Sequence, residues 1–101
     1  MSKEQIKQAI RRTVELAPYK LEVKKLSLFG SYLNGIPREN SDVDILVEFV
    51  PQAKIGFFKM YDVQKSMEQA LSKKVDIVTA NQLSKYFRVG VLKQAEVIYE
   101  R

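Results

Sequence analysis

Hydrophobic residues recur every three or four positions near the start of the chain, a spacing typical of an amphipathic helix. The residues that carry this repeat are Ile6, Ile10 and Val14. Ser2 followed by Gln5 forms a capping-box pattern in front of the repeat, and Pro18 lies where the helix would have to stop. We therefore predict a helix that begins after Ser2 and ends near Pro18.

Three later segments have the short apolar runs and β-branched residues that are typical of strands. These segments are residues 24–29, 42–50 and 74–79. The second carries the strongest strand signal in the chain, and Pro51 ends it. A short final strand is expected at residues 97–99.

Two more helices are expected in the second half of the chain. The first covers residues 56–71, with one apolar stripe formed by Met60, Val63, Met67 and Leu71. The second follows a capping-box pattern at Thr79 and Gln82, and its apolar stripe is formed by Leu83, Phe87, Val91 and Ala95. Residues 32–35 are expected to form one helical turn and residues 36–40 a loop. The order of elements predicts an α/β fold with a mixed sheet flanked by helices.

Length and composition narrow the possible chemistry. The 101 residues fit one small domain, residues 1–101, and contain neither cysteine nor histidine. Disulfides, cysteine-based zinc sites and histidine-based triads are therefore excluded, and carboxylates, hydroxyls, Lys/Arg or a bound metal must do any chemistry. Apolar stretches are too short for a membrane span, and the start is too polar for a secretory signal. These features favour a cytoplasmic location.

The net charge of +5 has two interpretations. It could simply maintain solubility, or it could attract a polyanion such as a nucleotide, a nucleic acid or an acidic protein. The basic residues are scattered, with no run longer than two, which argues against a dedicated nucleic-acid arm. We therefore do not expect nucleic acid as a partner.

Asp42 and Asp44 are the first candidate pair for chemistry. Side chains alternate along a strand, so both carboxylates should point the same way, while Val43 and Ile45 point into apolar packing. Two neighbouring like charges raise each other's pKa, and a divalent cation between them would remove the conflict. Mg²⁺ suits carboxylate oxygens and also binds phosphates. The alternative is a solvated polar face at the start of a strand.

Two further candidates for chemistry lie just after the first predicted strand and within the third. Gly30 and Ser31 follow the first strand, where a glycine allows a close backbone approach and the next amides could bind an anion. Asp76 lies among core-type residues of the third strand and could be a third metal ligand and a general base. The alternatives are an ordinary turn at Gly30 and a solvent-facing strand-edge charge at Asp76.

The combination of these features resembles the polymerase β-type nucleotidyltransferase superfamily, and more closely its minimal nucleotidyltransferase family. The resemblance rests on Gly30-Ser31, then Asp42-Val43-Asp44 in an apolar strand, then a lone Asp76. It extends over nearly the whole chain, whose length is also typical of the family. It implies the small nucleotidyltransferase fold with a mixed sheet.

The resemblance also implies a role for each of these residues. Gly30 and Ser31 would hold the triphosphate of an NTP, expected to be ATP. Asp42 and Asp44 would bind two Mg²⁺ ions, or Mn²⁺, and Asp76 would bind the catalytic ion and help to deprotonate the attacking group. The expected reaction is transfer of AMP by a two-metal in-line displacement.

Members of this family often act as antitoxins that adenylylate a HEPN-type partner protein. The resemblance therefore predicts a HEPN-type partner, and the small open site favours association with a partner or with a second copy of the chain. An alternative is a binding module that masks its partner by contact alone. A phosphatase or glycosyltransferase that uses a DxD pair is a third possibility, but it leaves Gly30-Ser31 and Asp76 unexplained.

One position departs from the family pattern. Many relatives carry Arg-Gly where this chain has Asn34-Gly35, so either Arg38 supplies the missing cation or triphosphate affinity is lower. Lys85 and Arg88 could be phosphate-side cations or part of a solvated helix face. Aromatic residues that could stack on a base, or belong to the core or an interface, are Tyr32, Phe57, Phe58 and Tyr61.

Overall fold

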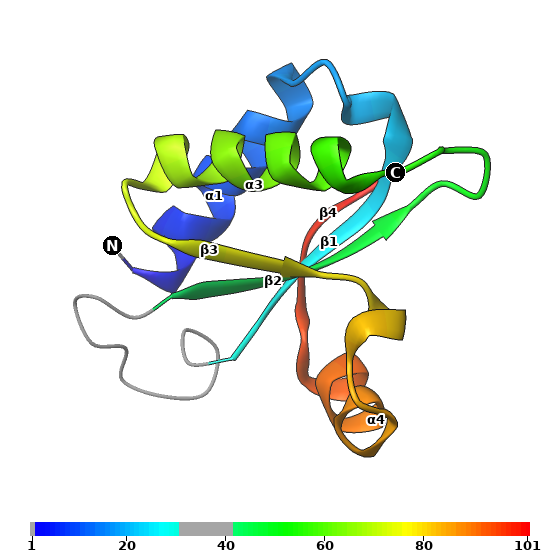
Figure 1. Cartoon of the computed structure of the whole chain (residues 1–101). Helices are drawn as coiled ribbons and strands as arrows, with labels where there is room; N and C mark the ends of the chain where they lie inside the picture. The colour runs from blue at the N-terminus through cyan, green and yellow to red at the C-terminus, as the bar shows by residue number, and fades with distance from the viewer. Residues whose placement is uncertain (1, 31–41) are drawn as a thin grey trace.

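The computed structural model describes residues 2–30 and 42–101, and its elements follow the expected order (Figure 1). The helices and strands are α1 (Lys3–Leu16), β1 (Val23–Phe29), β2 (Val43–Phe49), α3 (Phe57–Leu71), β3 (Val75–Val78), α4 (Lys85–Gln94) and β4 (Glu96–Glu100). Two 3₁₀ turns lie at Lys20–Glu22 and Ala80–Gln82. The helical turn and loop expected at residues 32–40 lie outside the described residues. None of the described helices is long and apolar enough to cross a membrane.

The four strands form one mixed sheet in the order β3-β2-β1-β4. β1 pairs antiparallel with both β2 and β4, whereas β2 and β3 are parallel. Parallel neighbours need a crossover connection, and α3 supplies it. The α/β class with a mixed sheet is therefore confirmed.

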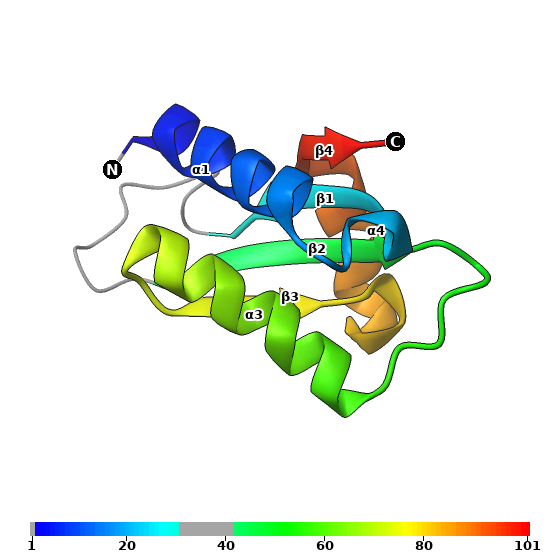
Figure 2. The same cartoon turned by 90° about the horizontal axis from the view of Figure 1, so that it is seen from above.

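The hydrophobic core lies between this sheet and two helices. α1 and α3 lie side by side on one face of the sheet (Figure 2). The predicted stripe of α1 is fully buried, and so are Val63 and Met67 of α3. The sheet contributes alternate residues of its strands: Leu26, Leu28, Val43, Ile45, Val47 and Val75. Strand alternation thus sends the residues between them, including Asp44, to the opposite face.

The ends of α1 match the capping signals in the sequence. The Ser2 amide donates to Gln5 Oε1 at 2.8 Å, and the Gln5 amide donates to Ser2 Oγ at 3.2 Å. The helix ends at Leu16, because Ala17 is already extended, as the residue before a proline usually is. The predicted capping box is confirmed.

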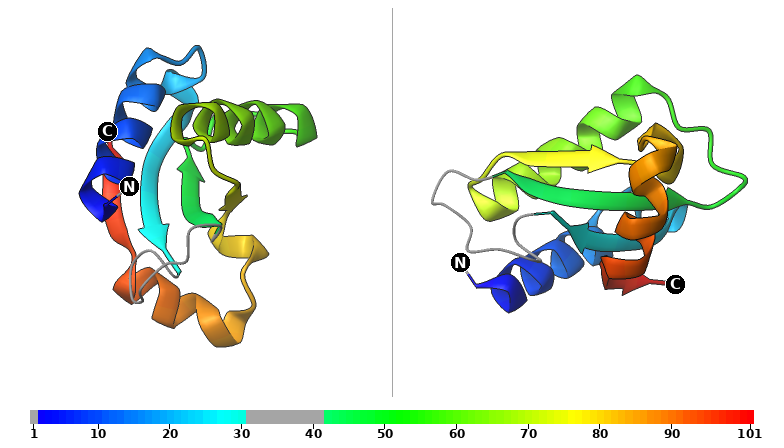
Figure 3. Two further views of the ribbon diagram at one scale, coloured as in Figure 1. Left: turned by 90° about the vertical axis from the view of Figure 1, so that its left-hand side faces the viewer. Right: turned by 90° about the horizontal axis from the view of Figure 1, so that it is seen from below.

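The last helix differs from its prediction in two ways. The Thr79–Gln82 box forms, with the Thr79 amide donating to Gln82 Oε1 at 2.8 Å, but it caps the 3₁₀ turn at Ala80–Gln82. α4 begins only at Lys85, after Ser84 as its N-cap. Nor is its apolar stripe a core stripe, since no α4 side chain is buried within the described part of the chain. α4 crosses the face of the sheet opposite α1 and α3 (Figure 3, right), where no second helix completes the layer among the described elements.

Two aliphatic residues of α1 test which face of this helix holds the fold together. Ile10 is fully buried and Leu16 is 80% exposed. We expect Ile10→Ala to lower the free energy of unfolding by about 2 to 5 kcal/mol, because it leaves a cavity. Leu16→Ala should change it by less than about 0.5 kcal/mol. Urea denaturation followed by circular dichroism measures both, and equal losses would contradict the placement of the core.

Candidate functional site

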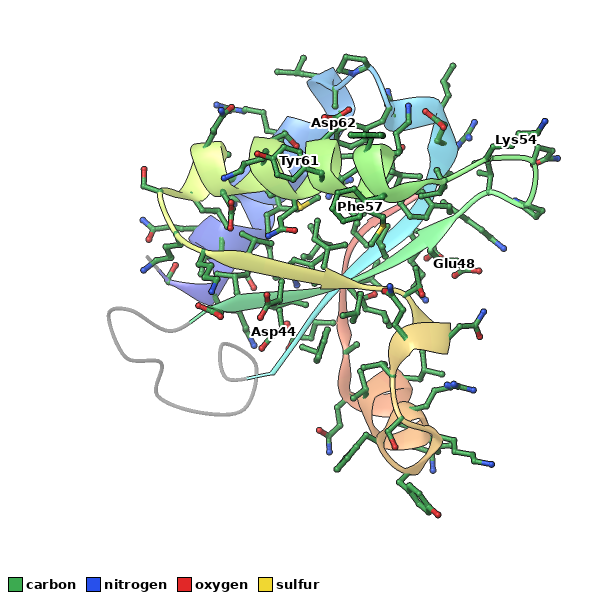
Figure 4. The ribbon with its side chains drawn as sticks, viewed as in Figure 1. Asp44, Glu48, Lys54, Phe57, Tyr61 and Asp62 are labelled. Carbon is green, nitrogen blue, oxygen red and sulfur yellow. The ribbon has the colours of Figure 1, made fainter. Side chains whose placement is uncertain are left out.

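Strand register brings the predicted aspartates of two strands together. Asp44 of β2 is the pairing partner of Phe29 on one side and of Asp76 on the other. Paired residues of neighbouring strands project from the same face, so the Asp44 and Asp76 side chains share a face. Figure 4 shows Asp44 on the side of β2 away from α3. Asp42 lies at the entrance to the strand, two residues before Asp44.

Burial and neighbouring negative charges both act on the Asp44 carboxylate. Asp44 is half-buried, whereas Asp76 is exposed. Burial raises the pKa of Asp44 above its ordinary value, and the negative charges of Asp76 and then Asp42 raise this pKa further. Asp44 therefore lies close enough to Asp76 and to Asp42 for the charge of each to act on it.

The backbone at Gly30 fits tightly against this carboxylate. Gly30 has φ of +81°, in the left-handed region that favours glycine. A Cβ atom built there would also collide with the Asp44 carboxylate. The sequence predicts that a glycine at position 30 allows a close approach by phosphate. The structure adds a second reason for glycine at this position, which is the Asp44 carboxylate packed against it. Ser31, the expected partner of Gly30, lies outside the described residues.

The donor chemistry of the site suits a divalent cation. Asp44 and Asp76 pair across two neighbouring strands, with Asp42 just before the first of them, and a cation would relieve the repulsion that the other two exert on Asp44. Among residues 2–30 and 42–101, no three acidic side chains form a ready-made metal cage. Mg²⁺ seldom uses such a cage, because it keeps waters and substrate phosphates among its ligands. The residues present therefore suit a divalent cation that brings further ligands of its own.

A helix side chain that sequence reasoning missed anchors the strand that carries Asp76. The Val75 amide donates to Glu68 Oε2 at 3.0 Å, and this hydrogen bond lowers the pKa of Glu68. Glu68 lies in the last turn of α3, where the helix dipole disfavours an acid. That unfavourable position is the only sequence signal that could have marked Glu68 for a special contact.

Other predicted candidates do not gather around Asp44. Phe57, Phe58 and Tyr61 are exposed on α3, which covers the opposite face of the sheet (Figure 4). Base stacking by them is not supported, and neither is a place in the core. Lys85 is exposed on α4, and Arg88 uses its guanidinium to donate to the Leu83 carbonyl at 3.1 Å. The candidates Tyr32, Asn34 and Arg38 lie outside the described residues.

Comparisons with known proteins show the family and the fold. A family model described as polymerase beta, nucleotidyltransferase matches residues 4–101. The chain is 35% identical over 79 residues to protein adenylyltransferase MntA of Thermococcus cleftensis, covering 76% of this chain and 74% of MntA. The solved structure of a proposed minimal nucleotidyltransferase superposes with a TM-score of 0.74 at 29% identity, with 94% of each chain covered.

A further solved structure shares the fold at lower identity. It is described as a tri-AMPylated Shewanella oneidensis HEPN toxin in complex with MNT antitoxin. The matched chain superposes with a TM-score of 0.67 at 19% identity, covering 98% of this chain and 73% of that one.

Removing the Asp44 charge should stabilise the protein in metal-free buffer. Because the folded-state pKa of Asp44 is raised, ionising this group destabilises the fold, and stability falls as pH rises from the ordinary aspartate value of about 3.9 through the folded value. Asp44→Asn should therefore raise the urea midpoint at pH 7, and this gain should disappear near pH 3. Glu48→Gln, on the same face of the same strand, is the control and should give little gain. An Asp44→Asn midpoint at or below wild type at pH 7 would contradict the electrostatic account.

A methyl group at position 30 should cost stability. Gly30→Ala must accept a positive φ, worth about 1 to 3 kcal/mol, and must also push the Asp44 carboxylate aside. Gly56→Ala is the control, because nothing lies within 4 Å of a Cβ at that position. Urea titration of both variants tests the contact. The close approach is refuted if Gly30→Ala is no less stable than Gly56→Ala.

Proposed function

Since the chain belongs to the polymerase β-type nucleotidyltransferase family, we propose that it transfers AMP from ATP to a side chain of a partner protein. The observation that carries this proposal is the register that seats Asp44 between the Gly30 bend and Asp76. An NTP needs metal-binding carboxylates beside a backbone bend that can approach phosphate, and the closeness of Gly30 to Asp44 supports such a role for both.

The acceptor and the donor nucleotide are inferred from relatives. The MntA relative is named as a protein adenylyltransferase, which points to AMP and a protein acceptor. The Shewanella complex pairs an MNT antitoxin with an AMPylated HEPN toxin. We propose by extension that the partner of this chain is a HEPN-type protein and that the chain is its antitoxin.

Each residue of the site has a distinct part in this scheme. Asp42 and Asp44 would hold two Mg²⁺ ions, or Mn²⁺, with Asp76 as a further ligand. The bound ions would neutralise charge on the triphosphate and lower the pKa of the attacking oxygen. Gly30 and Ser31 would receive the triphosphate, and the absence of a side chain at position 30 would let this backbone lie directly beside the Asp44 carboxylate.

The transfer step balances without any other reactant. The hydroxyl oxygen of the acceptor side chain forms a bond to the α-phosphorus of ATP. The bond between that phosphorus and the oxygen bridging to the β-phosphate breaks, and pyrophosphate leaves. The hydroxyl proton passes to the Asp76 carboxylate, which is exposed and therefore within reach of solvent.

The main alternative is a binding module that masks its partner without chemistry. Two features favour this binding module. Asn34 stands where many relatives have arginine, and α4 carries an exposed apolar surface. Weaker triphosphate binding at Asn34 would slow transfer but leave contact with a partner intact. The two functions therefore separate when labelling and binding are measured on the same samples.

AMP transfer is tested with α-³²P-labelled ATP, Mg²⁺ and a HEPN-type protein as the candidate acceptor. Wild type should label that protein. Asp42→Asn and Asp44→Asn should each reduce labelling by more than about 100-fold, since changes that only support metal ligands already cost about 10- to 100-fold. The control Glu48→Gln should label normally. Calorimetry should show weaker MgATP binding in both aspartate variants.

Two results would overturn the enzymatic proposal. One is undiminished labelling or unchanged MgATP affinity in the aspartate variants. The other is a wild type that binds and neutralises the HEPN-type protein without labelling it, which would establish the binding-module alternative.

A further inference from the structure

The α4 helix presents an apolar surface that the described part of the chain leaves uncovered. α1 and α3 each bury three side chains, whereas α4 buries none. Four of its large apolar residues are more than half exposed: Tyr86 88%, Phe87 70%, Val89 60% and Leu92 52%. Large apolar side chains gathered on one short helix are typical of an interaction surface.

The residues of α4 also depart from the preferences of an isolated helix. Its first turn contains Lys85 and no acid, although the helix dipole favours acids there. Gly90 lies mid-helix, where glycine costs about 0.5 to 1 kcal/mol, and nothing lies within 4 Å of a Cβ at that position. Contacts among residues 2–30 and 42–101 thus give no reason for Gly90, which follows Tyr86 by four positions and shares its face. A bare backbone there lets another chain approach closely.

The charge of α4 has one sign. Lys85, Arg88 and Lys93 lie between residues 85 and 94, and that stretch contains no aspartate or glutamate. The surface is thus an apolar patch bordered by cations. A partner that matches it would present apolar side chains bordered by acids.

The position of α4 connects this surface to the candidate site. α4 crosses the face of the sheet that also carries Asp44 (Figures 3 and 4). Leu92 of α4 lines a small cleft together with Leu46, which lies on that face two residues after Asp44. Two residues of strand span about 7 Å. A protein held on α4 would therefore stand beside the carboxylates.

We infer that the exposed face of α4 docks the protein acceptor, by binding an acidic, partly apolar surface of that protein. This inference rests on the proposed function and adds to it the surface that selects the substrate. Asp42, Asp44 and Asp76 act on the nucleotide, and α4 places the acceptor hydroxyl next to them.

Other occupants fit α4 less well. In a two-fold contact between copies of this chain, α4 would face its own cations, which repel. A nucleic acid would match the charge but not the apolar surface of Val89 and Leu92, because non-specific binding depends mainly on phosphate contacts. An acidic protein surface satisfies both the charge and the apolar area.

The apolar part of the surface is tested by paired serine substitutions. The double variant Tyr86→Ser/Phe87→Ser should raise the KM for the HEPN-type protein at least about tenfold, since buried aromatic anchors carry much of the energy of an interface. Its affinity for MgATP should stay unchanged. Phe57→Ser/Phe58→Ser is the matched control, because it removes two equally exposed aromatics from α3 on the other side of the sheet. Equal effects of the two double variants, or no effect of the α4 pair, would overturn the inference.

Charge and close approach are tested by two more changes. Lys85→Glu/Lys93→Glu should weaken docking far more than Arg12→Glu/Lys20→Glu, which changes the net charge equally on other elements. Gly90→Ala should stabilise the free chain and yet weaken docking, because its methyl group meets the partner. A Gly90→Ala variant that gains stability and docks like wild type would count against the inference.

Docking must be measured apart from transfer. Sedimentation of the unmodified HEPN-type protein with Asp44→Asn reports binding without chemistry, and the α4 changes should weaken it in that background as well. If wild type transfers no AMP while docking still depends on α4, the proposed function fails and the docking surface stands. If transfer occurs with α4 variants behaving as wild type, the docking surface fails alone.

Nucleic acid as the occupant of α4 is tested with a single-stranded RNA oligonucleotide. If the chain binds this RNA, and Lys85→Glu/Lys93→Glu abolishes RNA binding but leaves docking unaltered, α4 would be assigned to nucleic acid instead.

Discussion

Burial of a carboxylate beside two other acids is the constraint on which this structure depends. Asp44 is flanked along its own strand by Asp42 and across the sheet by Asp76, and its pKa is raised by burial and by both neighbours. The fold accepts this cost while also pressing the Gly30 backbone against the same carboxylate. Unfavourable local arrangements of this kind are typical of functional sites, where the surroundings hold them in place.

The rest of the fold explains how that arrangement is held. The apolar face of the sheet packs on α1 and α3 and forms the core. Strand alternation leaves Asp44 on the opposite face. α3 makes the crossover that sets β3 parallel to β2, and Glu68 fixes the start of β3 through the Val75 amide. The position of Asp76 beside Asp44 is thus a consequence of helix packing and of one hydrogen bond that lies outside the site.

Local patterns in the sequence were sufficient for some of these features. Alternation along the strand correctly placed Asp44 on the face opposite Val43 and Ile45, and the Ser2–Gln5 box correctly located the start of α1. The sequence offered Asp76 either as a third ligand beside the other two aspartates or as a solvent-facing charge, and local pattern could not decide because its pairing with Asp44 joins separate strands. The stripe around Phe87 has helical periodicity, but periodicity does not reveal whether a second layer covers it. The contact between Glu68 and the Val75 amide joins two separate elements. The only sign of it in the sequence is an acid in the last turn of a helix. The roles of Ser31 and Asn34 remain predictions from sequence.

The most direct test of this account is the pKa of Asp44, measured by NMR titration of its side-chain carboxyl carbon with and without Mg²⁺ and a non-hydrolysable ATP analogue. The account predicts a pKa above the ordinary value of about 3.9 in the free protein. It also predicts that Asp76→Asn lowers this pKa and that Mg²⁺ with the analogue lowers it further. An ordinary pKa that neither the substitution nor the metal nucleotide shifts would contradict it.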